Sequence, residues 1–253
     1  MMKRPLILIT NDDGVNAKGI RVLAHLAEKF GDVVVVAPAA NSSGKGHSMT
    51  MGTPLRLHEL QKEEHLTVYS CEGTPVDCVK LAVDYCCPRR PDLVLSGVNH
   101  GSNASVNVLY SGTMGAVVEA SVSGYPAIGF SLLNHRPDAD FGKAIPYMEE
   151  IVDKVLREGL PEHVSLNVNI PDGDIRGVRV CRQSFAVWGD SFEQRMDPYG
   201  HPYYWITGHF DCPDDGPDTD QWALGQGYVS IVPTQADLTA HQAIPQIKAS
   251  FEK

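Results

Sequence analysis

Short runs of consecutive apolar residues alternate with stretches of helical periodicity along the first two thirds of the chain. Residues 6–9 and 33–36 are continuous apolar runs, as is typical of strands covered on both faces of a parallel sheet. Between them, apolar residues recur at helical spacing from Ile20 to Phe30, and Gly31 is placed to end that helix. This order predicts a strand–helix–strand unit.

The same alternation continues to about residue 170. Thr74, Pro75 and Asp77 supply an N-cap, a proline at the first helical position and an acid at the third, so a helix is predicted to begin there. Further buried strands are predicted over residues 93–95, 126–132 and 164–170.

The last third of the chain has a different pattern. Strands are predicted over residues 178–181, 203–206 and 228–232 with no long helix between them, and a turn is predicted at residues 198–200 (Pro-Tyr-Gly). We therefore predict an α/β fold with a Rossmann-like, mostly parallel sheet, helices on both of its faces, and a C-terminal antiparallel hairpin extension. The predicted division is a core of residues 1–172 and an extension of residues 173–253.

Composition and charge narrow the possible classes of protein. The chain has 253 residues, of which 43% are hydrophobic and 21% charged, as in a globular protein. Its net charge of −10 argues against binding to a nucleic-acid polymer, and an anionic ligand would need a metal ion or a helix N-terminus. Six cysteines without a C-x-x-C pair, and an N-terminal apolar run too short for a signal or a membrane span, predict a cytoplasmic protein with no membrane partner.

The first candidate site directly follows the first predicted strand. Asp12 and Asp13 are adjacent carboxylates that would repel each other unless solvent separates them or a cation joins them. Hard oxygen ligands of this kind suit Mg²⁺ or Mn²⁺. The alternative is that one of the two aspartates caps the following helix.

Two further polar loops, residues 41–48 and 96–103, follow other predicted strands. Ligands of open α/β sheets bind beyond the carboxyl ends of the strands, so the three loops are expected at one edge. Each loop alone could be an ordinary surface loop. Residues 111–113 (Ser-Gly-Thr) add a helix N-terminus that favours phosphate, although a plain N-cap is the alternative. A cation beside an anion site is what phosphoryl transfer to water requires.

Other phosphate and nucleotide motifs do not fit. The first strand is not followed by the glycine-rich dinucleotide fingerprint, and no P-loop or nucleophile-elbow motif occurs. A haloacid-dehalogenase start would place Asn11 at the nucleophile position, and an amide cannot accept a phosphoryl group.

Taken together, these motifs resemble the stationary-phase survival protein SurE family over nearly the whole chain. The matching segments are Thr10-Asn11-Asp12-Asp13-Gly14, Ser43-Gly44-Lys45-Gly46-His47-Ser48, Gly73-Thr74-Pro75-Val76-Asp77-Cys78-Val79, Ser96-Gly97-Val98-Asn99-His100-Gly101 and Ser111-Gly112-Thr113. The resemblance implies a metal-dependent nucleotidase that hydrolyses nucleoside 5′- and 3′-monophosphates, with polyphosphate as a further substrate of some members.

The resemblance also implies the site residues. One divalent cation per subunit, Mg²⁺ or Mn²⁺, would be held by Asp12, Asp13, Ser43 and Asn99. The phosphate would be bound by Ser111, Gly112 and Thr113, with Asn103 as a neighbour. Water would attack phosphorus directly, and Asp12 or Asp13 is a candidate acceptor of its proton.

Asp237 and His241 match a family segment proposed to lie near the site, where they could protonate the leaving oxygen. Their spacing predicts one helical face, and the alternative is a surface pair. His47 and His100 are expected to support the site without taking part in the chemistry.

Aromatic residues bracket the predicted hairpin, which resembles the family's projecting arm for subunit assembly. They are Phe192, Tyr199, Tyr203, Tyr204 and Trp205. The resemblance predicts a homodimer or homotetramer with exchanged C-terminal elements, whereas the alternative is that the aromatic side chains pack on their own core.

Three functions are compatible with these patterns: a metal-dependent nucleotidase, a phosphatase acting mainly on polyphosphate or small phosphate esters, and a non-catalytic nucleotide-binding module. The paired aspartates disfavour the third, because they would repel a nucleotide in the absence of a metal ion.

Overall fold

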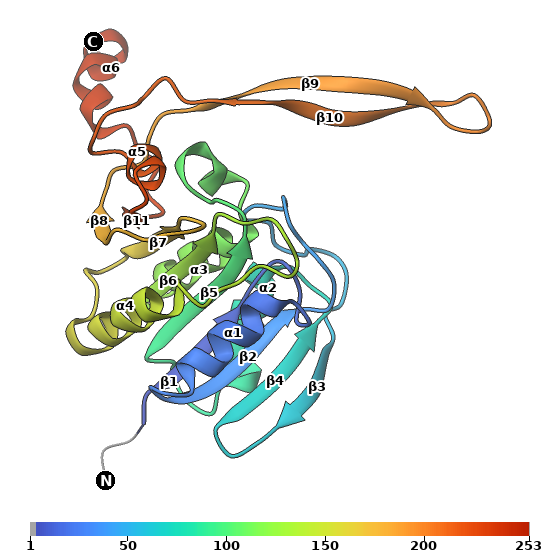
Figure 1. Ribbon diagram of the computed structural model, residues 1–253, viewed down its shortest axis with the longest axis vertical. Coiled ribbons are helices and arrows are strands. Elements are labelled where there is room, and N and C mark those ends of the chain that lie inside the picture. Colours follow the sequence, from blue (N-terminus) through green and yellow to red (C-terminus); the bar gives the residue numbers. More distant parts are fainter. Residues whose placement is uncertain (1–3, 253) are drawn as a thin grey trace.

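The structure is a computed structural model that describes residues 4–252. A nine-stranded sheet with the order β3-β4-β2-β1-β5-β6-β7-β11-β8 forms the body, and β9 and β10 form a separate two-stranded sheet (Figure 1). The strands are β1 (Leu6–Thr10), β2 (Asp32–Pro38), β3 (Leu57–Lys62), β4 (Leu66–Cys71), β5 (Leu93–His100), β6 (Ala127–Leu132), β7 (Ser165–Ile170), β8 (Val178–Val180), β9 (Val187–Met196), β10 (Pro202–Asp211) and β11 (Val229–Thr234). Within the main sheet, only the pairs β3–β4 and β7–β11 are antiparallel, which confirms the predicted fold class.

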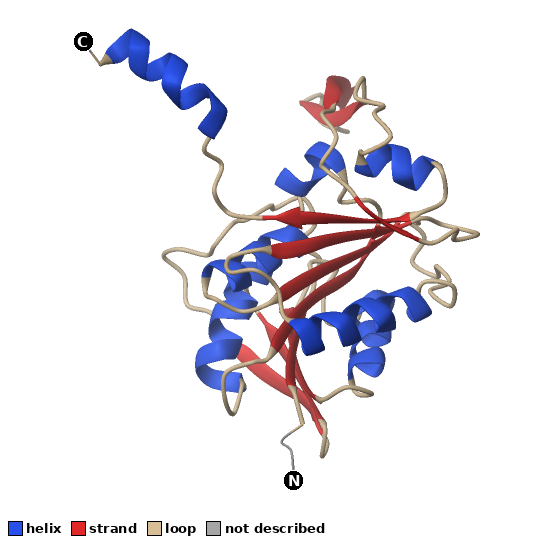
Figure 2. Cartoon of the chain, turned by 90° about the vertical axis from the view of Figure 1, so that its left-hand side faces the viewer, coloured by secondary structure: helices blue, strands red, loops and turns tan. Residues whose placement is uncertain are grey.

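Helices cover both faces of this sheet (Figure 2). The α-helices are α1 (Lys18–Ala27), α2 (Pro75–Leu81), α3 (Gly112–Val122), α4 (Ile145–Glu158), α5 (Asp220–Gly225) and α6 (Ile244–Phe251). Short helical turns are η1 (Ala82–Cys86), η2 (Ser105–Leu109) and η3 (His241–Ala243).

Each face of the sheet has its own apolar core. Ile7 and Ile9 pack with α1 and α4 in one core, whereas Leu6 and Leu8 pack with α2 and α3 in the other. Because side chains alternate between the faces of a strand, a strand covered on both sides is apolar at every position. Full burial stabilises each such side chain by about 1.5–3 kcal/mol, so the core fixes the strands whose ends carry the polar loops.

The start of α2 confirms the predicted capping signal. The Thr74 hydroxyl accepts a hydrogen bond from the Asp77 amide at 3.2 Å, and the Asp77 carboxylate accepts one from the Thr74 amide at 2.8 Å. The Thr50 amide also donates to Asp77, at 3.1 Å. Burial raises the pKa of the Asp77 carboxyl, but the hydrogen bonds from Thr50 and Thr74 outweigh it and leave this pKa below its ordinary value.

Helix α1 ends at Ala27, so the prediction of a helix as far as Phe30 was wrong at this end. The Phe30 amide still donates to the Ala27 carbonyl, but in a tight turn that leads into β2. Gly31 serves a different purpose from the one predicted. A Cβ atom there would lie 2.2 Å from the carbonyl oxygen of Pro5, so the chain needs glycine for a close backbone approach.

The C-terminal third divides between the main sheet and a projecting hairpin. Strands β8 and β11, predicted over residues 178–181 and 228–232, belong to the main sheet, where β11 pairs with β7 and β8 pairs with β11 at the edge. The strand predicted over residues 203–206 is part of β10, which pairs with β9, a strand that the sequence reasoning missed (Figure 1). The predicted turn at residues 198–200 joins them, closed by an amide–carbonyl bond of 3.0 Å from Gly200 to Asp197. The division at residue 172 stays a prediction, although the sheet itself continues across it.

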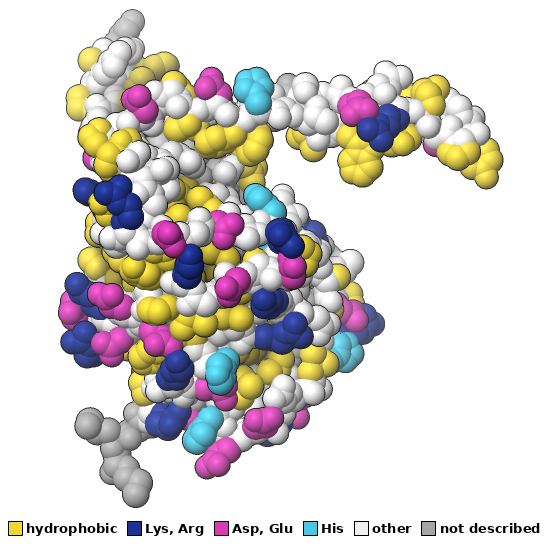
Figure 3. Space-filling view, in the orientation of Figure 1, with side chains coloured by type: hydrophobic (Ala, Val, Ile, Leu, Met, Phe, Trp, Pro, Cys, Tyr) yellow, Lys and Arg dark blue, Asp and Glu magenta, His cyan; other side chains and the backbone are white. Residues whose placement is uncertain are grey.

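Two elements extend away from the body. The hairpin carries apolar side chains along its length (Figure 3), including Phe192, Tyr204 and Trp205, all of which are exposed, so within one chain they do not pack on their own core. Helix α6 extends from the body and has no buried residue (Figure 2). In the part of the chain that the structure describes, no helix is both long and apolar enough to cross a bilayer.

Candidate active site

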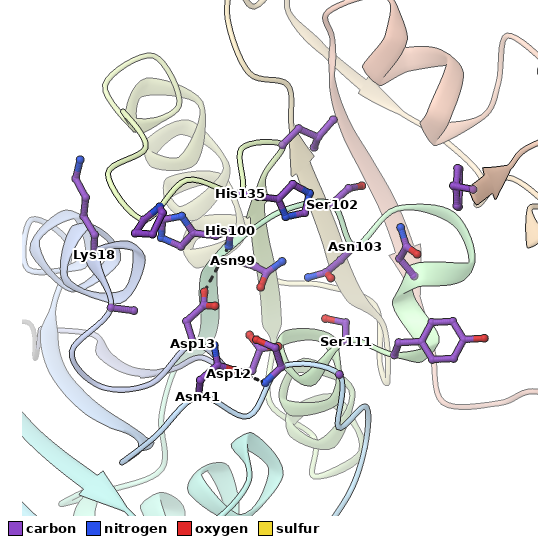
Figure 4. A pocket seen from close by; sticks show the side chains of 18 of the residues that line it. Asp12, Asp13, Lys18, Asn41, Asn99, His100, Ser102, Asn103, Ser111 and His135 are labelled. Atoms are coloured by element: carbon purple, nitrogen blue, oxygen red, sulfur yellow. Dashed lines mark hydrogen bonds between the residues drawn. The ribbon is translucent and has the colours of Figure 1, made fainter. Parts of the chain in front are cut away.

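A pocket of about 930 Å³ lies at the carboxyl ends of β1 and β5, where the polar loops converge (Figure 4). Six of the predicted site residues line it: Asp12, Asp13, Ser43, Asn99, Asn103 and Ser111. The remaining four, Gly112, Thr113, Asp237 and His241, are not among its lining residues.

Asp12 is held against the N-terminus of α3. The residue is 3% exposed, and its carboxylate accepts a hydrogen bond of 2.7 Å from the Thr113 hydroxyl. Burial raises the pKa of Asp12, and this effect outweighs the Thr113 hydroxyl and the backbone amides of Thr113 and Gly112, which lower it. Gly112 and Thr113 therefore contact Asp12 directly, and their assignment to the phosphate stays a prediction. Ser111 is the N-cap of α3, because its hydroxyl accepts the Met114 amide at 3.0 Å.

Asp13 and Asn99 lie next to Asp12 on the pocket floor (Figure 4). Burial raises the pKa of Asp13, and the neighbouring Asp12 charge raises it further, against a smaller opposite effect of His100. The side-chain amide nitrogen of Asn99 donates to the Gly101 carbonyl at 2.8 Å, so its side-chain oxygen is left as an acceptor.

The loop after β2 is tied to the aspartates through its backbone. The Ser42 amide donates to the Asp12 carbonyl at 2.7 Å, and the Ser43 amide donates to the Asn41 side chain at 2.7 Å. These bonds bring the exposed Ser43 to the pocket that contains both aspartates. The helix-capping alternative for Asp12 and Asp13 fails, because the N-cap of α1 is Ala17 and no side chain caps it.

This donor set fits a hard divalent cation. Two adjacent carboxylates with raised pKa values are unfavourable together unless a positive charge lies between them. Of the described residues that line the pocket, Lys18 is the only lysine or arginine, and its ammonium group already donates to the carbonyls of Asp138 and Ala139. Nowhere in residues 4–252 do three or more His, Cys, Asp or Glu side chains form a metal cluster, so neutral oxygens such as those of Ser43 and Asn99 would complete the ligand set.

Hydrogen bonds with the buried side chains of Asn167 and Asn169 hold Asn103 in place. The sequence reasoning named Asn103 but missed these two supporting residues. The Asn103 amide donates to Asn169 at 2.8 Å, and the Asn103 carbonyl accepts from Asn167 at 2.8 Å. The Asn169 side chain donates to the Asn167 side chain at 2.9 Å, and the Asn103 side chain donates to Ser131 at 2.9 Å. The signal in the sequence was a pair of asparagines at alternate positions of β7, each next to an apolar residue.

Asp237 and His241 form a pair outside the pocket. Their side chains are 2.7 Å apart, and both are exposed in the segment between β11 and α6. The prediction of one helical face was wrong, because Asp237 accepts the Thr239 amide in a local turn that competes with a helix. The hydrogen bonds of Thr239, followed by that of His241, lower the pKa of Asp237 to about 2.

The two histidines near the site differ in position. His100 lines the pocket, with its Nδ1 atom 2.9 Å from the Arg136 carbonyl oxygen and its ring packed edge-on against Phe141. His47 lies outside that lining and pairs with Glu119 at 3.2 Å. Tyr110, Trp188 and Phe210 also line the pocket, and the sequence reasoning did not associate them with the site.

The fold and the pocket together define a Rossmann-like α/β protein with an acidic, oxygen-lined ligand site at the carboxyl edge of its sheet. The family model described as survival protein SurE matches residues 7–190. The chain belongs to this family, which confirms the resemblance inferred from the motifs.

Relatives match over nearly their full lengths. A protein of Flavobacterium psychrophilum named 5′-nucleotidase SurE is 53% identical over 96% of both chains. A protein of Cytophaga hutchinsonii with the same name is 47% identical over 99% of this chain and 98% of its own. The crystal structure of the SurE protein from Aquifex aeolicus superposes with a TM-score of 0.83 at 38% identity, covering 97% of this chain and 99% of that one.

Proposed function

We propose that this protein is a metal-dependent phosphomonoesterase that hydrolyses nucleoside 5′-monophosphates, and 3′-monophosphates, to nucleoside and phosphate. The observation that carries the proposal is the position of Asp12 and Asp13 in one pocket with Asn103 and Ser111. The names of the relatives, 5′-nucleotidase SurE, support the substrate class.

In this proposal each polar group has one task. Asp12, Asp13, Ser43 and Asn99 would hold one Mg²⁺ or Mn²⁺ ion, which supplies a positive charge to the phosphoryl oxygens. Ser111 and Asn103 bind and orient the phosphate, and Gly112 and Thr113 act through Asp12, which they hold in place. Water attacks phosphorus in line with the leaving oxygen, and no covalent phosphoenzyme is formed.

We propose that Asp237 and His241 act at the site of a second subunit. Within one chain they lie on an exposed segment that leads into the extended helix α6. We propose a homodimer or homotetramer in which this C-terminal segment is exchanged and the hairpin packs against a partner. Light scattering on a sizing column tests this, and a monomer at micromolar concentration would contradict it.

Chelation tests the proposed chemistry directly. We expect EDTA to abolish phosphate release from AMP and GMP, and Mg²⁺ or Mn²⁺ to restore it. Phosphate release that is unchanged after thorough metal removal would refute the metal-dependent mechanism. Binding of AMP without phosphate release in the presence of either metal would instead favour a non-catalytic nucleotide-binding module.

Asp12→Asn tests the same site by substitution. The change removes one ligand charge at almost constant volume, so we expect turnover to fall by a factor of about 10² or more while the fold persists. Hydrolysis at the parent rate would show that Asp12 has been assigned the wrong role.

A further inference from the structure

An aromatic wall faces the pocket beyond the residues proposed to bind phosphate. Tyr110 directly precedes Ser111, the N-cap of α3. Trp188 and Phe210 are paired across the base of the hairpin, and both line the pocket as well. Trp188 is tied to Asn107, four residues before Ser111, and four residues of extended chain span at most about 14 Å. The aromatic wall therefore belongs to the same pocket as Ser111.

Trp188 is held in one orientation although much of its surface is open. Its indole N–H donates to the Asn107 side-chain oxygen at 2.8 Å, and its ring meets that of Phe210 at a centroid distance of 5.4 Å and an angle of 64°. Even so, 43% of Trp188 is exposed. A large ring that is fixed by two contacts and still exposed is a preorganised binding surface, because little further side-chain ordering is needed to cover it.

Open space adjoins the same side chains. Tyr110 is 54% exposed. Tyr110 and Trp188 line the main pocket, and both also line an adjoining cavity of about 460 Å³ bounded by residues 206–208 of β10. A flat ligand group can therefore lie against either ring without displacing protein atoms.

The charge of this wall selects the kind of ligand. Asn107, which contacts Trp188, is neutral, and Gln221 is a further neutral lining residue of the pocket. Lys18, the only lysine or arginine among the described lining residues, lies on the opposite side of the pocket from Ser111 (Figure 4). A polyphosphate chain would need cations along its length, whereas a neutral heterocycle with polar edges fits an aromatic wall with amide groups.

We infer that Trp188 and Tyr110 form a stacking platform for the nucleobase of the substrate, with Phe210 and Asn107 fixing the orientation of Trp188. This inference rests on the proposed function and extends it: the platform makes the enzyme prefer nucleotides to phosphate esters that lack a base. Stacking of a base on an aromatic side chain corresponds to about 5- to 150-fold in affinity.

The test compares GMP with ribose 5-phosphate, which carries the same sugar and phosphate without the base. We expect kcat/KM for GMP to exceed that for ribose 5-phosphate by about 5- to 150-fold in the parent protein. In Trp188→Ala this ratio falls toward one, through a higher KM for GMP, while KM for ribose 5-phosphate stays unchanged. Trp188→Phe keeps a stacking ring and retains most of the preference.

Trp205→Ala is the matched control, because Trp205 is an exposed tryptophan of the same hairpin that does not line the pocket. Any effect of this change on assembly alters the rates for both substrates together and leaves their ratio at the parent value. Equal kcat/KM for the two substrates in the parent, or an unchanged ratio in Trp188→Ala, would overturn the inference.

Calorimetric measurement of GMP and ribose 5-phosphate binding, beside phosphate release, distinguishes a failure of the stacking platform from a failure of the proposed function. Phosphate release from both substrates without a preference for GMP refutes the platform and leaves the proposed function intact. A protein that releases no phosphate from either substrate, yet binds GMP more tightly than ribose 5-phosphate only when Trp188 is present, refutes the proposed function and keeps the platform.

Discussion

The buried amide chain beneath Asn103 allows a quantitative prediction for Asn169→Leu. The Asn169 side chain accepts from the Asn103 amide and donates to the Asn167 side chain, and all three residues are buried. Leucine has a similar size but can make neither hydrogen bond. One buried donor and one buried acceptor are then left without partners, and each costs about 1–3 kcal/mol.

We therefore expect the free energy of unfolding to fall by about 2–6 kcal/mol. Urea denaturation followed by circular dichroism measures this as a lower midpoint at an unchanged slope. Asn16→Leu is the matched control, since Asn16 is exposed, and a surface change of this kind stays within about 0.5 kcal/mol of the parent.

Activity provides the second measurement for Asn169→Leu. Because Asn103 loses its backbone anchor, we expect kcat/KM for AMP to fall by about 100-fold at a temperature where the variant is fully folded. A urea midpoint equal to that of the parent would refute the stability argument. Parent activity in a destabilised variant would show that Asn103 does not need this anchor for catalysis.

Three further substitutions test other parts of the structure. Thr113→Val removes the hydroxyl that donates to Asp12 and should lower kcat by about tenfold or more. Thr113→Ser keeps a hydroxyl donor and should keep the parent rate. Equal rates in the two variants would contradict a role for this hydrogen bond. Gly19→Ala, in the first turn of α1, should lower the melting temperature, because the new Cβ atom would lie 2.0 Å from the Val98 carbonyl oxygen. This clash should outweigh the higher helix propensity of alanine. A raised melting temperature would disprove the close contact. The pKa of Asp77 is lower in the folded protein than the value of about 3.9 in the unfolded chain, so its carboxylate stabilises the fold above about pH 3.9, and this stabilisation is lost as the pH falls through the folded pKa. Asp77→Asn should therefore flatten the acid limb of a plot of unfolding free energy against pH. An unchanged limb would count against the lowered pKa.

Strong local signals made much of the fold predictable. The valine run of β2 is apolar at every position because both faces of that strand are covered, and the cap at Thr74 fixes the start of α2 through bonds within four residues. Strand β3 could not be recognised in the same way. It lies at the sheet edge, and most of its residues are exposed and polar, so neither alternation nor an apolar run marks it.

The same distinction separates the site residues that could be predicted from those that could not. Asp12, Asp13 and Asn99 follow directly after strands or lie at their carboxyl ends, so the rule that parallel strands end at one edge was enough to group them. The support of Asn103 by Asn169 depends on the register between β6 and β7, and the pairing of Trp188 with Phe210 depends on the register of the hairpin. Neither register follows from the spacing of residues along the chain.

We propose that the hairpin has two roles, in assembly and in base recognition, which its sequence pattern does not separate. Its exposed outer part, with Phe192 and Trp205, has the character of an assembly surface, and its base contributes Trp188 and Phe210 to the pocket wall. A ten-residue strand pair transmits the position of its outer part to its base, because each residue is hydrogen-bonded or packed against its cross-strand neighbour. Packing of the outer part against a partner should act on every substrate alike, because neither Phe192 nor Trp205 lines the pocket. Substitutions at the outer part should therefore change the rates for GMP and ribose 5-phosphate together, whereas only substitutions at the base of the hairpin should change the preference for the nucleobase.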